Sequence, residues 1–241
     1  MTRDKRLTAG VLGGMGPEAT VDFMARVVAL VSGSRDQDHV PMIVDHNPQV
    51  PDRQAAMRGD RAPVNAALLA MARRLQAAGA DFLVMPCNTA HVFLHGIEQA
   101  VDIPLLHIID ETVSEIGPAV PGARQVGLLA TDACLESGIY QQAITRSARE
   151  AVLPDDASQA ELMRLIARIK SGDRSEPVAA ALAQIAERLV QQGAQLIVAG
   201  CTEIPLVLHA ASCSVPVLSS TEVLAKRTVA VSTGKESLPQ E

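Results

Sequence analysis

The sequence predicts an α/β protein with two similar halves, each containing a mostly parallel β-sheet. Short apolar runs alternate with longer amphipathic runs along the 241 residues. The segment GADFLVMPC at 79–87 recurs as GAQLIVAGC at 193–201, without a gap. Hydrophobic residues make up 48% of the chain and charged residues 20%, which suits a globular protein with a sizeable core. Strands that alternate with helices are typical of parallel sheets.

Periodicity places the elements of the first half in the order strand, helix, strand, helix, strand, helix. Pro17 suits the first turn of a helix, and Leu68, Met71 and Leu75 share one helical face. The last of these helices must end before Pro104. The expected strands are 7–12, 42–45 and 81–85, and the expected helices are 17–31, 63–78 and 88–100.

The second half repeats this pattern. Gly127 aligns with Gly10, and Val215-Pro216 aligns with Ile103-Pro104. We expect strands at 125–130 and 195–199, and helices at 137–149, 160–170, 177–191, from 205 onward, and at 222–231. The predicted domains are therefore 1–106 together with 217–241, whose last helix completes the first half, and 107–216.

Composition excludes several classes of partner. Lys and Arg total 21 and Asp and Glu total 27, which gives a net charge of −6 without a basic block. Such a chain is unsuited to nucleic acid or an anionic membrane. Four aromatic residues leave little for base stacking. No apolar run has transmembrane length, and no signal peptide is evident at the N-terminus, so we expect a cytoplasmic protein.

The repeated cysteines, Cys87 and Cys201, carry the strongest indication of chemistry. Each follows a predicted strand, at the edge where parallel sheets bind ligands, and precedes a predicted helix that would lower the thiol pKa. If the halves face each other, one thiolate can remove a proton from a carbon while the other thiol returns one to the opposite face. Amides near Asn88, Thr89 and Thr202 would stabilise the resulting charge. A buried cysteine is often only packing, which is how we interpret Cys213.

Two other interpretations remain open. Cys87, His91 and His95 have a spacing of four that could bind zinc, although no second paired motif accompanies them. Alternatively, His91 helps to position the loop. The run Gly14-Met15-Gly16 fits part of a dinucleotide fingerprint, but the expected acidic residue about twenty positions later is missing. The turn better fits an amide cradle for a small carboxylate.

Two cations are candidates for binding substrate carboxylates. Arg53 follows a proline-stiffened loop, and arginine pairs with carboxylates through two hydrogen bonds. A solvated loop charge would explain Arg53 as well. Lys170 stands at a predicted helix C-terminus, where compensation of the helix dipole is the simpler explanation.

Five motifs, in order along nearly the whole chain, resemble the aspartate/glutamate racemase family, and its aspartate racemase branch most closely. They are GGMGP at 13–17, NPQVPDR at 47–53, MPCNTAH at 85–91, GLLAT at 127–131 and AGCTE at 199–203. The resemblance implies two α/β domains related by a pseudo-twofold axis, with the active site in the cleft between them. It also implies a homodimer and a racemase that uses neither pyridoxal phosphate nor a metal.

The resemblance further implies a role for each matched residue. Cys87 and Cys201 are the expected acid/base thiols. Arg53 and Lys170 resemble binders of the substrate side-chain carboxylate. The remaining expected substrate contacts are Met15, Gln49, Asn88, Thr89, Ala90, Thr131 and Thr202.

The expected activity is interconversion of L- and D-aspartate, with glutamate as a further substrate. Cys134, where the aspartate racemase pattern tends to have a threonine, and His46, where many relatives have asparagine, bear on substrate choice. A hydantoin racemase, a maleate isomerase and a non-catalytic carboxylate-binding protein are the alternatives on the same scaffold.

Overall fold

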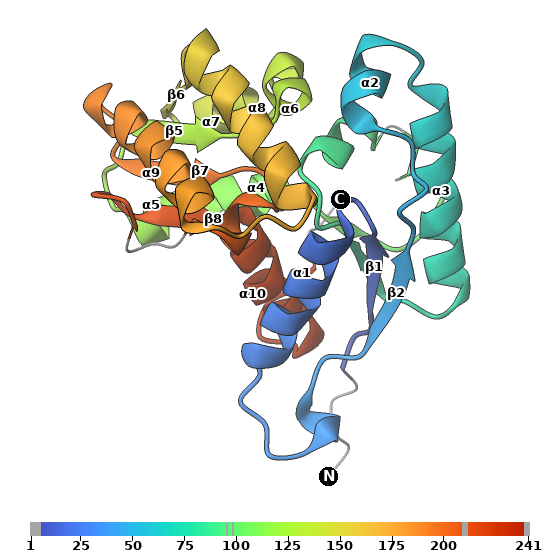
Figure 1. Ribbon diagram of the computed structural model, residues 1–241. Helices are drawn as coiled ribbons and strands as arrows, with labels where there is room; N and C mark the ends of the chain where they lie inside the picture. Colours follow the sequence, from blue (N-terminus) through green and yellow to red (C-terminus); the bar gives the residue numbers. More distant parts are fainter. Residues whose placement is uncertain (1–5, 95, 98, 209–211, 239–241) are drawn as a thin grey trace. The chain divides into compact units, whose positions relative to one another are not determined.

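The computed structural model describes residues 6–94, 96–97, 99–208 and 212–238. The chain divides into two compact units, each built on a four-stranded parallel sheet (Figure 1). One unit contains the described residues up to Ile108 and those from Leu224 onward, and the other is Ile109–Val223. Across the described residues, no helix is both long and apolar enough to cross a membrane.

The sheet of the first unit has the strand order β2-β1-β3-β4. Its strands are β1 (Ala9–Gly13), β2 (Met42–His46), β3 (Phe82–Val84) and β4 (Leu105–Leu106). In Figure 1, α3 lies on one side of β1 and β2, and α1 and α10 lie on the other. The helices are α1 (Pro17–Ala29), α2 (Arg53–Arg58), α3 (Ala62–Ala77) and α10 (Ser220–Ser232), with 3-10 turns η1 (Asp36–Asp38) and η2 (Thr89–Phe93).

The sheet of the second unit has the matching order β6-β5-β7-β8. Its strands are β5 (Gln125–Leu129), β6 (Glu150–Val152), β7 (Leu196–Ala199) and β8 (Val217–Ser219). The apolar faces of α8 and α9 form a core with β7. The helices are α4 (Ile108–Ser114), α5 (Ile116–Ala119), α6 (Asp132–Ser137), α7 (Ile139–Arg146), α8 (Asp156–Lys170) and α9 (Glu176–Gln191), with the 3-10 turn η3 (Ile204–Leu206).

The predicted repeat extends to the register of the strands. Gly10 of β1 pairs with Leu83 of β3, and Gly127 of β5 pairs with Ile197 of β7. A Cβ on Gly10 would lie 2.8 Å from Ala80 Cβ, and one on Gly127 would lie 3.1 Å from Ala194 Cβ. The two sheets therefore bring repeat-related residues into the same close contacts.

The helix-to-strand turns also repeat. Gly79 (φ 97°) and Gly193 (φ 106°) end α3 and α9 in the left-handed region, where glycine has no steric penalty. After each glycine an alanine N–H donates to a leucine carbonyl of the helix, Ala80 to Leu75 and Ala194 to Leu189. Each helix is thereby turned back into the strand that leads to a cysteine.

The prediction of long helices after the two cysteines is wrong. Of the expected helix 88–100 only η2 forms, because Gly96 takes a left-handed φ of 90°, and residues 95 and 98 lie outside the described residues. The helix expected from 205 extends over residues 209–211, which lie outside the described residues. In the described part, η3 forms at Ile204–Leu206, and Val207 leaves helical geometry at φ −135°. The expected helix 137–149 is shorter in the structure, because Gly138 takes a left-handed φ of 70° and α7 covers Ile139–Arg146.

The chain passes between the units at 108/109 and 223/224, where the sequence analysis expected 106/107 and 216/217. The second crossing lies later because Val217–Ser219 forms β8, which pairs with β7 in the second sheet. The expected assignment of 217–223 to the first half therefore differs from the observed division. The elements that were not predicted are short: α2, α4, α5, α6, β4, β6, β8 and the 3-10 turn η1.

Candidate active site

The two cysteines occupy equivalent places, one in each unit. Cys87 follows β3 and precedes η2, and Cys201 follows β7 and precedes η3. Both are nearly buried, with 7% and 5% of their surface exposed. Each is followed by a short 3-10 helix, so neither cysteine lies at the N-terminus of the α-helix that the sequence predicts there.

Cys201 contacts a buried carboxylate. Its Sγ donates a hydrogen bond to Glu203 Oε2 over 3.0 Å, and Glu203 is 4% exposed. Lys170 Nζ lies 3.7 Å from the other carboxylate oxygen, Oε1. Burial and the Glu203 charge raise the pKa of the Cys201 thiol well above its usual range, and Lys170 opposes this. The expectation of a lowered pKa is therefore wrong for Cys201, whose thiol form is stabilised.

Cys87 is held through its backbone. His91 Nδ1 lies 2.9 Å from the Cys87 carbonyl oxygen, and the Ile108 N–H donates to His91 Nε2 over 3.3 Å. Because Nε2 accepts, the ring proton belongs on Nδ1, which donates to Cys87. Burial, with His107 whose ring centroid is 4.7 Å away, holds the pKa of His91 well below its usual range. A neutral His91 thus ties the Cys87 loop to the end of the first unit.

The glycine-rich turn after β1 is organised by Thr20, a residue that the sequence analysis did not single out. Thr20 Oγ1 accepts from the Gly14 N–H over 2.9 Å and donates to the Gly16 carbonyl over 3.1 Å. Gly14 has φ 93°, and a Cβ there would lie 2.4 Å from the backbone of Asn47. The Met15 side chain is buried within this turn. The sequence signal for Thr20 was a polar residue on the buried, apolar face of α1.

The predicted carboxylate binder of the first unit, Arg53, begins α2. Its Nη1 donates to the carbonyls of Val50 and Pro51, each over 3.0 Å. The neighbouring Asp52 caps α2 by accepting from the Ala55 N–H. Arg53 is therefore anchored on its own loop, and Gln49 on the same loop is exposed.

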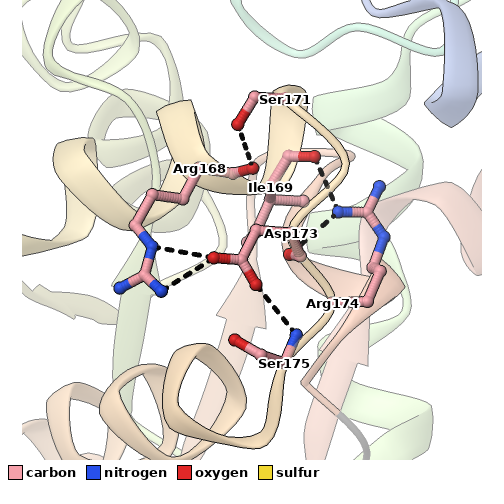
Figure 2. Close-up of polar contacts among 6 residues, drawn as sticks. All are labelled: Arg168, Ile169, Ser171, Asp173, Arg174 and Ser175. Carbon is pink, nitrogen blue, oxygen red and sulfur yellow. Dashed lines mark hydrogen bonds and ion pairs between the residues drawn. The ribbon is translucent and has the colours of Figure 1, made fainter.

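The predicted carboxylate binder of the second unit, Lys170, ends α8, and the loop after it is closely bonded. Figure 2 shows Asp173 accepting from the guanidinium of Arg168 and from the Ser175 N–H, at 2.7–3.0 Å. Hydrogen bonds from Ser175 and Arg168 lower the pKa of Asp173 to about 2. Arg174 donates to the Ile169 carbonyl over 2.6 Å. These contacts fix the helix end from which Lys170 reaches Glu203.

The predicted site residues are divided between the two units. The first unit contains Cys87, Met15, Gln49, Arg53, Asn88, Thr89 and Ala90, and the second contains Cys201, Thr131, Lys170 and Thr202. Asn88, Ala90, Thr131 and Thr202 are each at most 4% exposed, and Thr89 is 7% exposed. Thr131 is the N-cap residue of α6, in which Cys134 is fully buried. Glu203 belongs to the AGCTE motif, but no sequence pattern predicted its ion pair with Lys170.

The zinc hypothesis gains no support from the structure. Among the described residues, which leave out His95, no group of three His, Cys, Asp or Glu side chains could hold a metal ion. His91 instead uses both ring nitrogens on the backbone.

Comparison with known proteins identifies relatives over almost the full length. The sequence profile of the Asp/Glu/Hydantoin racemase family matches residues 12–228. The chain is 33% identical over 226 residues to the broad specificity amino-acid racemase RacX of Bacillus subtilis (strain 168), covering 91% of this chain and 96% of that protein.

Solved structures agree. Picrophilus torridus aspartate racemase has a TM-score of 0.78 at 29% identity, covering 94% of each chain. A putative Asp/Glu racemase from Yersinia pestis has a TM-score of 0.79 at 30% identity, covering 94% of this chain and 99% of the other. The chain therefore belongs to the Asp/Glu/hydantoin racemase family of isomerases.

Proposed function

We propose that this racemase interconverts the L and D forms of aspartate, with glutamate as a second substrate, by proton transfer between the α-carbon and two cysteines. The observation that carries the proposal is the equivalence of Cys87 and Cys201. Each follows the third strand of a four-stranded parallel sheet, and the two sheets share strand order and register. A racemase needs one proton-transferring group on each face of the α-carbon, so duplicated thiols suit it.

The proton balance of the proposed reaction is simple. The thiolate of one cysteine takes the α-proton, and the electron pair delocalises into the substrate carboxylate. The thiol of the other cysteine then delivers its proton to the opposite face, so that one thiol and one thiolate remain with exchanged roles. Backbone amides near Asn88, Thr89 and Thr202 are the proposed donors to the developing charge. This scheme requires both thiols to reach one substrate in the cleft that we propose between the two domains.

Binding of an acidic side chain is assigned to Arg53 and Lys170. Arg53 keeps its guanidinium on a short, anchored loop, which limits the entropy that it loses on binding. Lys170 lies at a helix end fixed by Arg168 and Asp173. Met15, Gln49, Ala90 and Thr131 are the further proposed contacts.

A wider substrate range is a second candidate, since the relative from Bacillus subtilis is named for broad specificity. Cys134 and His46 are the residues that we propose to affect substrate choice. The proposal also includes catalysis without pyridoxal phosphate or a metal, a homodimeric assembly and a cytoplasmic location.

The test uses protein treated with a chelator and with hydroxylamine, to remove metal ions and pyridoxal phosphate. Single enantiomers of aspartate, glutamate and alanine are incubated in deuterated water. Loss of the α-proton is followed by NMR, and handedness by chiral chromatography. Exchange with inversion for aspartate and glutamate, but not alanine, supports the acidic substrate, and equal turnover of alanine supports broad specificity. No exchange with any amino acid would overturn the proposal, and maleate and hydantoins would be assayed next.

A further inference from the structure

The second unit contains a group of ionisable side chains that the first unit does not repeat: the buried Cys201 and Glu203, with the half-exposed Lys170 beside them. The Cys201 thiol donates to Glu203 Oε2 over 3.0 Å. Glu203 Oε1 is buried without a hydrogen-bond partner among the described residues, and Lys170 Nζ lies 3.7 Å from it. Thr202 Oγ1 also donates to Oε2, over 3.4 Å.

The hydrogen bond distinguishes the two protonation states of Cys201. A thiol supplies the proton that Glu203 accepts. A thiolate would place two negative charges about 3 Å apart in a site where both side chains are largely removed from water, which is unfavourable. Lys170 reduces this repulsion only in part, because it pairs with the far carboxylate oxygen and is 44% exposed.

The corresponding loop of the first unit is built differently. Among the described residues, Cys87 makes its hydrogen bonds through its backbone, to His91 and Met85. Where Cys201 is followed by Thr202 and Glu203, Cys87 is followed by Asn88 and Thr89, which carry no charge. A carboxylate two positions after the cysteine is therefore a feature of one unit alone.

We propose that Glu203 is a positioning residue that keeps Cys201 in its proton-bearing thiol form, and that Lys170 limits this effect. Resting on the proposed two-thiol function, the inference assigns Cys201 the role of proton donor in the resting enzyme. After donation, the Cys201 thiolate beside Glu203 is a strong base, which suits it to remove the α-proton in the reverse direction. Glu203 itself does not touch the substrate in this scheme.

The other ionisable groups near Cys201 do not supply this effect. Tyr140 of α7 is fully buried, and burial raises its phenol pKa, which favours the neutral phenol. Cys134 of α6 interacts with Tyr140 and is also fully buried. Lys170 of α8 acts in the opposite direction to Glu203. The carboxylate is thus the negative charge that bears directly on the Cys201 thiol.

The test is a titration that needs no substrate. Protein labelled with ¹³C at cysteine Cβ is titrated by NMR, and the Cys201 signal is assigned with the Cys201→Ser variant. Glu203→Gln keeps the shape of the side chain but removes its charge. We expect the apparent pKa of Cys201 to fall by about one pH unit or more in this variant. Lys170→Met, at a half-exposed position, should raise it.

Glu187→Gln is the matched control. Glu187 raises the pKa of Cys213 in the same unit, so its neutralisation should lower the pKa of Cys213 and leave that of Cys201 unchanged. An unchanged Cys201 titration in Glu203→Gln would overturn the inference. If that variant does not fold, a Cys201 pKa that stays the same or falls in Lys170→Met overturns it instead. A racemization assay that fails while these shifts appear would refute the proposed function but not the Glu203–Cys201 coupling.

Discussion

The loops that carry Cys87 and Cys201 begin alike and are then restrained by different chemistry. Both follow the third strand of a parallel sheet, after a glycine turn and a strand of the same register. The Cys87 loop is tied to Ile108 by a neutral histidine, whereas Cys201 bonds to a charged carboxylate. Duplicated topology thus determines where the thiols lie, and the side chains that follow each cysteine determine which contacts hold it.

The largest effect should come from removing either thiol. Cys87→Ser and Cys201→Ser should each lower kcat/KM for inversion by on the order of 10³-fold or more, because a serine hydroxyl is a far weaker acid than a thiol and does not ionise to an anion that could take the α-proton. Chiral chromatography of aspartate measures the rate. Cys213→Ser, a change at a half-buried thiol outside the site, serves as control and should retain activity. If one cysteine variant keeps wild-type rates, the reaction does not need both thiols.

The Cys87 loop differs from the Cys201 loop in the two hydrogen bonds that the His91 ring makes to the backbone. His91→Ala removes the buried ring that bonds to the Ile108 N–H and to the Cys87 carbonyl, which should lower the free energy of unfolding by about 2–4 kcal/mol. Urea denaturation measures this loss. His46→Ala, at an exposed position at the end of β2, should change stability little. Equal stability of the two variants would mean that the His91 hydrogen bonds do not stabilise the Cys87 loop.

The packing that the two units share can be tested by substituting the equivalent strand glycines, Gly10 and Gly127. Alanine at Gly10 or Gly127 would overpack the equivalent helix–sheet contact, so each should cost about 1–3 kcal/mol of unfolding free energy. Gly10→Ala should cost more, since its Cβ meets Ala80 Cβ at 2.8 Å, whereas the closest atom at Gly127 is the movable Cδ1 of Ile197.

Gly117→Ala is the control for both glycine variants. It lies in α5, and its Cβ would meet only the flexible end of Arg149. Thermal denaturation should show little change for it. A loss of stability in only one of the two variants, Gly10→Ala or Gly127→Ala, would argue that the two units do not share this packing.

The sequence predicted the parts of the fold that depend on local pattern. The strands that precede the two cysteines, and the helices α3 and α9, follow from apolar periodicity and from the repeated segments. The helix after Cys87 was predicted wrongly because the left-handed conformation of Gly96 ends the helical run. Helix α2 was not predicted, because it is too short for its apolar residues to show a helical period. The capping residue Asp52 was the signal that marked its start.

The sequence predicted that each of the two cysteines follows a strand, but not the hydrogen bonds and the ion pair around them. The repeat indicated both cysteines. The ion pair of Glu203 with Lys170 joins a 3-10 turn to the end of α8, and the bond of His91 to Ile108 spans 17 residues. Such contacts depend on burial and on tertiary packing, which no local spacing encodes. For this reason the expected lowering of the Cys201 pKa was also wrong in direction.

The smallest predicted effect is a change in pH dependence. Cys201 must be protonated to donate, so kcat/KM should fall as pH rises through its raised pKa. Glu203→Gln removes a charge that favours the thiol, and the high-pH limb should move to lower pH. Aspartate racemization between pH 7 and pH 11 measures the limb. Movement to higher pH would show that Glu203 stabilises the thiolate instead.

The most direct test of two thiols acting on opposite faces is α-proton exchange by the single-cysteine variants in deuterated water. With Cys87 replaced by serine, only Cys201 can remove a proton, so exchange without inversion should occur from one enantiomer of aspartate. Cys201→Ser should exchange the opposite enantiomer. This mirror-image pattern is the predicted result. Exchange of the same enantiomer by both variants, or of both enantiomers by either one, would contradict the account.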